Sequence, residues 1–179
     1  MSKRMKTRDV AFAFRMGAGF PGDVNRTHPA SIEPCLINAS APPAFFGQAV
    51  LVGASGVRPI TTGDQSNTVA AGYGITVRPY PFQQSSASNY VAAAIGAGAP
   101  PVTGVVDVLR AGYIMGQIPT GQTPAKGAPV YVWATASSGS NIQGGFTSVY
   151  TALNTTQVLN ATFNGPPDAS GNVEIAFNI

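Results

Sequence analysis

Two runs of apolar, β-favouring residues, at 105–118 and 130–133, give the clearest hydrophobic pattern in the middle of the chain. Both are rich in Val, Ile and Tyr, whose side chains pack well on a pleated sheet. The polar segment between them contains several prolines and glycines, which is typical of a loop. The apolar content of 104–117 also fits a helix, but three glycines oppose it, at roughly 1 kcal/mol each relative to Ala. The pattern therefore predicts a strand, a loop and a strand, with the rest of the chain packed against them.

Alternation of apolar and polar positions predicts further strands. It is strictest at the end of the chain, where Val173, Ile175, Phe177 and Ile179 are expected to share one face. Residues 159–163 are expected to pair with 173–177 through the turn-forming segment 165–171. Other strands are predicted at 32–37, which Pro34 makes an edge strand, and at 46–52, 57–60, 72–81, 141–149 and 157–163.

About eight to ten short strands with dense turn signals predict an all-β fold, either a β-sandwich or a β-barrel. We expect one β-rich domain at 16–179, preceded by an N-terminal arm at 1–15. Within the domain, residues 83–101 are low in complexity, with no strand signal, and are interpreted as an excursion or long loop.

Charge changes this picture in two ways. Charged residues make up 9% of the chain, compared with about 25% in a typical soluble domain, so we expect partners to cover much of the surface. The formal net charge of +3 lies in the arm: residues 1–15 contain five basic residues and one acidic residue, a net of +4, whereas 16–179 contain five basic and six acidic residues, a net of −1.

The neutral body argues against a nucleic-acid-binding domain, which needs a basic face. Two interpretations of the arm stay open. In the first it contacts an acidic surface or nucleic acid, and in the second it is a solvated tail. Its apolar run stops at Arg15, too short for a signal peptide, and no stretch approaches the 18 apolar residues of a membrane span. From the neutral body we expect no direct nucleic-acid partner, and from the short apolar runs no membrane partner.

The residue inventory argues against an enzyme. The single histidine, His28, has no implied triad, and the single cysteine, Cys35, is interpreted as a small buried hydrophobic residue. A metal site from Asp23, His28, Glu33 and Cys35 would mix ligand types at spacings that match no zinc-finger or zincin pattern. The sequence therefore predicts no catalytic residue, no metal and no cofactor.

Three arginines, Arg58, Arg78 and Arg110, lie in or beside apolar strands. A guanidinium in such a place needs a carboxylate or carbonyl partner. The first interpretation is internal pairing with Asp64, Asp107 or Glu174, and the second is contact across a subunit interface.

Several segments together resemble the capsid cement, or head decoration, proteins of tailed bacteriophages. They are AFRMGAGFPGDVNRTHPASIEP at 13–34, GYGITVRPYPFQ at 72–83, GVVDVLRAGYIMG at 104–116, KGAPVYVW at 126–133 and DASGNVEIAFNI at 168–179. Their order and spacing carry the resemblance, which spans roughly residues 11–179. The basic extension at 1–8 is longer than this family leads us to expect.

The resemblance implies a non-enzymatic, β-rich viral structural protein. Such proteins bind the outer surface of the phage head and clamp neighbouring major capsid subunits, which stabilises the DNA-filled shell. The implied partners are the major capsid protein and further copies of this chain, with a homotrimer favoured over a dimer. The implied location is the outside of the virion, after assembly in the bacterial cytoplasm. The candidate interface residues are Arg4, Lys6, Arg8, Phe12, Phe14, Arg15 and Arg78.

Two other functions remain open at this stage. One is a receptor- or glycan-binding module on the virion surface, which would use residues 83–99 and Tyr90. The other is a small hydrolase, which the residue inventory disfavours.

Overall fold

The computed structural model describes residues 19–64, 73–79 and 99–179, and these contain nine strands and one short 3-10 helix. In chain order they are β1 Ser31–Leu36, β2 Ala49–Gly53, β3 Gly56–Pro59, the 3-10 helix Thr62–Asp64, β4 Tyr73–Thr76, β5 Val105–Gln117, β6 Pro129–Trp133, β7 Phe146–Thr147, β8 Thr155–Phe163 and β9 Asn172–Phe177. The predicted all-β fold class is therefore confirmed. Within the described ranges, no helix has the length and hydropathy needed to cross a membrane.

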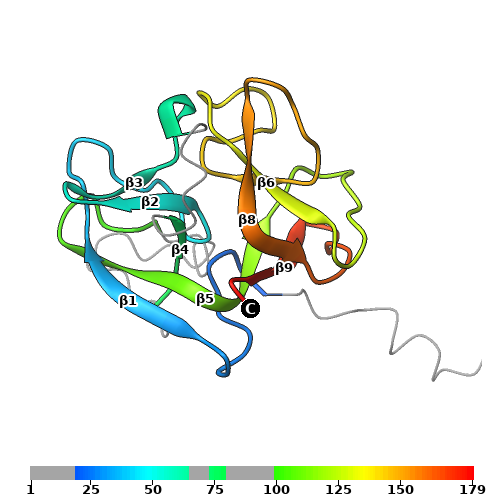
Figure 1. The fold of residues 1–179 in the computed structure, drawn as a ribbon, viewed down its shortest axis with the longest axis horizontal. Helices are drawn as coiled ribbons and strands as arrows, with labels where there is room; N and C mark the ends of the chain where they lie inside the picture. The colour runs from blue at the N-terminus through cyan, green and yellow to red at the C-terminus, as the bar shows by residue number, and fades with distance from the viewer. Residues whose placement is uncertain (1–18, 65–72, 80–98) are drawn as a thin grey trace, which may run out of the picture.

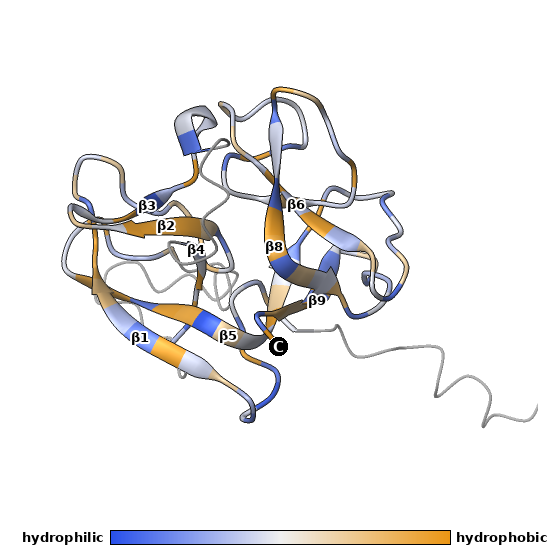
Figure 2. Ribbon diagram, in the orientation of Figure 1, coloured by the Kyte–Doolittle hydropathy of each residue, from blue (hydrophilic) through white to orange (hydrophobic). Residues whose placement is uncertain are grey.

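The strands form one curled sheet in the order β3-β2-β4-β5-β9-β8-β6-β7, and β1 pairs with β5. All the strand pairs are antiparallel. Figure 1 shows β1 to β4 with the first half of β5 on one side of the molecule and β6, β8 and β9 on the other. Figure 2 shows hydrophobic residues along β2, β5 and β6.

β5 belongs to both halves of this sheet. Its first half pairs with β1 and β4, and its second half, from Gly112 onwards, pairs with β9. At the change of partner, Gly112 has a φ of 138°, and a Cβ there would lie 3.0 Å from the carbonyl oxygen of Pro29. The absence of a side chain thus lets the chain before β1 approach β5 closely.

The first half of the fold closes into a small barrel. The strand contacts run from β1 through β5, β4 and β2 to β3, and one parallel bridge between Ile37, just after β1, and Val57 of β3 joins the two ends at a single point. A hydrophobic cluster fills the barrel, made of Ile37, Phe46, Val50, Val57, Val106 and Val108. The predicted barrel alternative thus describes this half of the chain.

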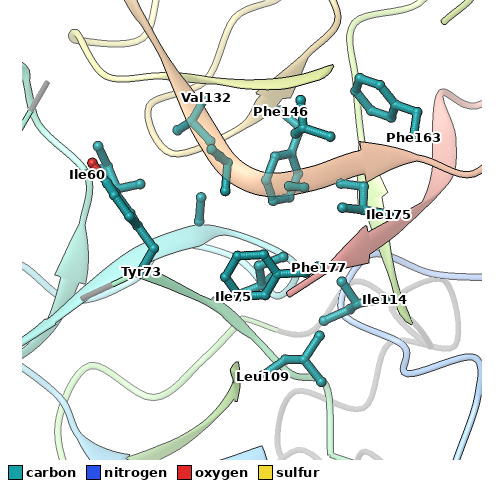
Figure 3. Packing of buried hydrophobic residues seen from close by; sticks show 14 of the residues in the cluster. Ile60, Tyr73, Ile75, Leu109, Ile114, Val132, Phe146, Phe163, Ile175 and Phe177 are labelled. Carbon is teal, nitrogen blue, oxygen red and sulfur yellow. The ribbon is translucent and has the colours of Figure 1, made fainter. Parts of the chain in front are cut away.

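The main core lies between the barrel and the second half of the sheet. It joins residues of β5, β6 and β9, which confirms that the two central strands and the C-terminal strand share one core. Figure 3 shows Ile75 and Leu109 of the barrel strands in this cluster with Ile175 and Phe177 of β9. Phe177 is 1% exposed, as expected for a central aromatic side chain.

Two strand predictions differ from the structure. In the predicted strand 141–149 only Phe146–Thr147 is a strand, because the chain around it forms tight turns, including hydrogen bonds between Ser138 and Asn141. Ile179 was expected on the buried face of the last strand, but it is 56% exposed. β9 ends at Phe177, and Asn178 has a φ of 52°, which turns the last residue away from that face.

Other predicted strands are found with shifted ends. The predicted 46–52 is β2 at Ala49–Gly53, and 72–81 contains β4 at Tyr73–Thr76. β1 is the predicted edge strand, with Pro34 opposite Asp107 of β5. The arm at 1–15 and residues 83–98 of the predicted excursion lie outside the described residues.

Candidate functional site

The arginines of the described body all form internal ion pairs. Arg58 pairs with Asp64 at 2.7 Å, which is one of the predicted pairings. Arg78 pairs with Asp23 at 3.4 Å, and Arg110 with Glu33 at 3.3 Å. The expected partner set of Asp64, Asp107 and Glu174 was thus wrong for these two arginines. The fourth, Arg26, pairs with Glu174 at 2.8 Å.

Arg78 is the one candidate interface residue within the described part of the chain, and its side chain is only 8% exposed. Its Nε donates to the carbonyl oxygen of Pro21 at 3.3 Å, and its guanidinium lies 5.2 Å from the ring centre of Phe20 and 5.7 Å from that of Phe46. Burial lowers the pKa of Arg78, although Asp23 acts in the opposite direction. These contacts hold residues 20–23 against the end of β4.

Glu174 of β9 holds the next part of the same segment. Its carboxylate accepts hydrogen bonds from Asn25, Arg26 and Asn164. Burial acts to raise the pKa of Glu174, but these hydrogen bonds lower it by more, so its pKa lies below the usual range. Arg26 also lies over the ring of Tyr113, 3.9 Å from its centre. The residues before β1 are therefore fastened to β5 and β9 by charge and by stacking.

The reactive side chains are not assembled into a catalytic or metal site in the described residues. His28 is exposed, and its ring is hydrogen-bonded to the carbonyl oxygen of the neighbouring Thr27. Cys35 was expected to be buried, but it is only half-buried because it lies on the edge strand β1. Burial and the nearby Glu33 raise the pKa of its thiol, which disfavours the reactive thiolate. The described ranges contain no group of three His, Cys, Asp or Glu residues placed to hold a metal ion.

Several large apolar side chains of the described residues are instead exposed, and two places hold a group of them. The first is the loop 148–154 between β7 and β8, hereafter the apolar loop, where Val149 is 52% exposed, Tyr150 64% and Leu153 83%. Leu153 also has a φ of 66°, a left-handed conformation that a leucine rarely adopts. The ring of Tyr150 packs against that of Tyr131, with 5.7 Å between their centres.

The second is a groove at the open end of the barrel, hereafter the barrel-mouth groove. It lies between the end of β1, the β2–β3 turn and the start of β5, and its lining residues include Leu36, Ile37, Ala39, Val52, Ala54 and Gly104. Leu36 and Val105, which are partners in the β1–β5 register, are 70% and 52% exposed. Val102 is 66% exposed and lies next to Thr103, another lining residue.

Comparison with known proteins agrees with a structural role. The family model of the XM1 gp53 minor capsid protein matches residues 10–177. The chain belongs to this family. Membership confirms the predicted relationship to phage capsid-associated proteins and gives the chain a structural role in a phage virion.

A solved structure agrees with the family at the level of the fold. The chain is similar to a chain in the capsid of Myoviridae phage XM1, with a TM-score of 0.62, 16% identity and 92% of each chain covered. No curated protein sequence matches the chain.

The candidate interface residues Arg4, Lys6, Arg8, Phe12, Phe14 and Arg15 lie outside the described residues. Sequence reasoning missed the exposed residues of the apolar loop and the groove. Val149 and Leu36 were placed in or near strands, and an apolar residue in a strand pattern is indistinguishable from a core residue until the strand's partners are known. The one signal available was the run from 127 to 167, which contains no charged residue.

Proposed function

We propose that this minor capsid family member is a cement protein, which binds the outer surface of the phage head and clamps neighbouring major capsid subunits. The match of the family model over residues 10–177 is the observation that carries the proposal. The body suits this role because its arginines are neutralised internally while two apolar surfaces remain exposed. Apolar contacts to protein are therefore favoured over attraction to nucleic acid.

In this proposal the protein acts as a homo-oligomer, with a trimer favoured over a dimer. Copies bound side by side bridge the shell through many weak contacts, since each contact raises the effective concentration for the next. The protein joins the shell during assembly in the bacterial cytoplasm and stays on the outside of the virion.

The N-terminal arm supplies the anchor in this proposal. Its basic residues, including Arg4, Lys6 and Arg8, steer the arm towards an acidic protein surface. Exposed ion pairs contribute only about 0.2–1 kcal/mol each, so retention depends on the apolar residues. Burial of Phe12 and Phe14 contributes roughly 1.5–3 kcal/mol per side chain. Arg78, which fastens the segment after the arm, is included in the interface on this hypothesis.

The experiment adds the purified protein to phage heads that lack it. Bound protein is measured by sedimentation, and head integrity by the temperature at which the DNA is released. Binding with a higher release temperature is expected, whereas binding without stabilisation would favour a receptor- or glycan-binding module. Deletion of residues 1–8 is expected to weaken the salt dependence of binding to the heads. The Phe12→Ala/Phe14→Ala variant is expected to bind more weakly at every salt concentration. If both variants bind like the parent, the arm is only a tail.

A further inference from the structure

The apolar loop presents its side chains on a fixed backbone. The side-chain oxygen of Gln122 accepts hydrogen bonds from the backbone N–H and the hydroxyl of Ser148, at 2.8 and 3.0 Å. The hydroxyl of Thr155 bonds both the N–H and the carbonyl oxygen of Thr151, at 2.9 and 3.0 Å. A loop held in this way loses little conformational entropy when its exposed residues bind a partner.

The segment that carries the loop has no charged residue. The chain contains no Asp, Glu, Lys, Arg or His from residue 127 to residue 167, which includes β6, β7, β8 and their connections. Burying the side chains of this segment therefore removes no ionised group from water. The free-energy cost of removing such groups opposes many other protein contacts. A surface that matches the chemistry of the apolar loop is therefore uncharged and apolar, with a hollow that accepts the exposed side chains of the loop.

The barrel-mouth groove of the same chain has this chemistry. Its lining residues are all uncharged, and the exposed Leu36 lies at its edge. The groove and the apolar loop belong to different halves of the fold: Figure 1 shows β1 and β3 on one side and β6 and β8 on the other. The two surfaces are therefore separate, and the loop of one copy does not fill the groove of the same copy.

We propose that the apolar loop of one copy docks in the barrel-mouth groove of a second copy. This inference rests on the homo-oligomer of the proposed function and assigns its contact. Where two copies make this contact once, it is heterologous: one loop and one groove stay free, and repetition around an axis closes a ring such as a trimer. Three loop side chains bury less than the roughly 800 Å² per partner of a standard interface, so the contact is weak in solution and strengthens where copies are held together.

The test uses disulfide trapping without any phage shell, in a Cys35→Ala background. Protein with Leu153→Cys is mixed with protein carrying Val102→Cys, and the covalent dimer formed under a mild oxidant is followed with time. The matched control replaces Val102→Cys with Ile179→Cys, which is exposed to a similar degree and is not among the residues that line the groove. We expect the loop–groove mixture to cross-link several-fold faster than the control.

Two results would overturn the proposal: equal rates in both mixtures, or a dimer formed fastest by Leu153→Cys alone, which means that two loops face each other. Leu153→Asn gives a second readout, because asparagine tolerates the left-handed conformation and removes the apolar side chain. We expect this variant to keep its melting temperature and lose the concentration-dependent rise in sedimentation coefficient. Unchanged self-association would contradict the proposal. Since no shell is present, these results are independent of whether the protein binds phage heads.

Discussion

The guanidinium of Arg58 on β3 binds the carboxylate of Asp64 at two points, with both nitrogen–oxygen distances at 2.7 Å. Asp64 also accepts hydrogen bonds from the N–H and the hydroxyl of Thr61, each at 2.8 Å. The bonds from Arg58 and then those from Thr61 outweigh burial and lower the pKa of Asp64 to about 2. This pair fixes the chain that leaves the barrel after β3.

Replacing Asp64→Asn is expected to make stability less dependent on acid pH. The folded-state pKa lies below the ordinary value of 3.8, so the carboxylate stabilises the fold fully above that value, and the stabilisation is lost as the pH falls towards 2. The shift corresponds to on the order of 2 kcal/mol at pH 7. Urea unfolding at pH 7 and pH 2.5 measures it. The difference in free energy of unfolding between parent and variant should shrink at pH 2.5. A difference that stays constant would mean that the ion pair does not cause the loss of stability in the variant.

Phe177→Ala is expected to reduce the free energy of unfolding by roughly 3–5 kcal/mol, because it empties a site in the main core. Ile179→Ala is the matched control two residues later, where the side chain is 56% exposed. It should cost less than about 1 kcal/mol, in the range of ordinary surface substitutions. Denaturant titration separates the two outcomes, and a small effect of Phe177→Ala would place that ring outside the core.

Gly74→Ala is expected to overpack the barrel, because a Cβ at Gly74 would overlap Cγ1 of Val108. Overpacking of this kind typically costs about 1–3 kcal/mol. Adding Val108→Ala removes the overlapping methyl group, so the double variant should be more stable than the two single effects added together predict. Gly63→Ala is the control, since a Cβ there lies 3.9 Å from the nearest atom, on Thr61. Simple additivity in thermal unfolding would refute the proposed overlap.

His28→Gln and Cys35→Ala are expected to leave binding to phage heads unchanged. His28 is exposed and bonded to its neighbour's carbonyl oxygen, and the half-buried Cys35 has a raised thiol pKa. Sedimentation with heads measures binding after circular dichroism has shown that each variant is folded. A folded His28→Gln protein that no longer binds would argue against a purely structural role.

The sequence predicted strands where the hydrophobic signal was local. The alternation at Val173, Ile175 and Phe177 needed no knowledge of the rest of the chain, and these residues are buried as predicted. The 13-residue β5 was also identified, since its glycines opposed a helix.

Long-range relationships were not predictable in the same way. Arg78 pairs with Asp23, 55 residues earlier, because residues 20–25 run beside β5 and the end of β4. β8 and β9 lie between the two central strands, an order that no local pattern encodes. The exposed Leu153 shows the same limit: it lies between the predicted strands 141–149 and 157–163, and no local pattern shows whether a residue of such a connection is packed or exposed.

The sharing of β5 between the barrel and the second half of the sheet has a mechanical consequence. A force that pulls the two halves apart acts along or across one continuous 13-residue backbone and on the hydrogen bonds of β1, β4 and β9 that flank it. Extension then requires several of these bonds to shear together, since β5 runs unbroken from one half to the other. Tension at one edge of the sheet is therefore transmitted to the other edge through the backbone of β5.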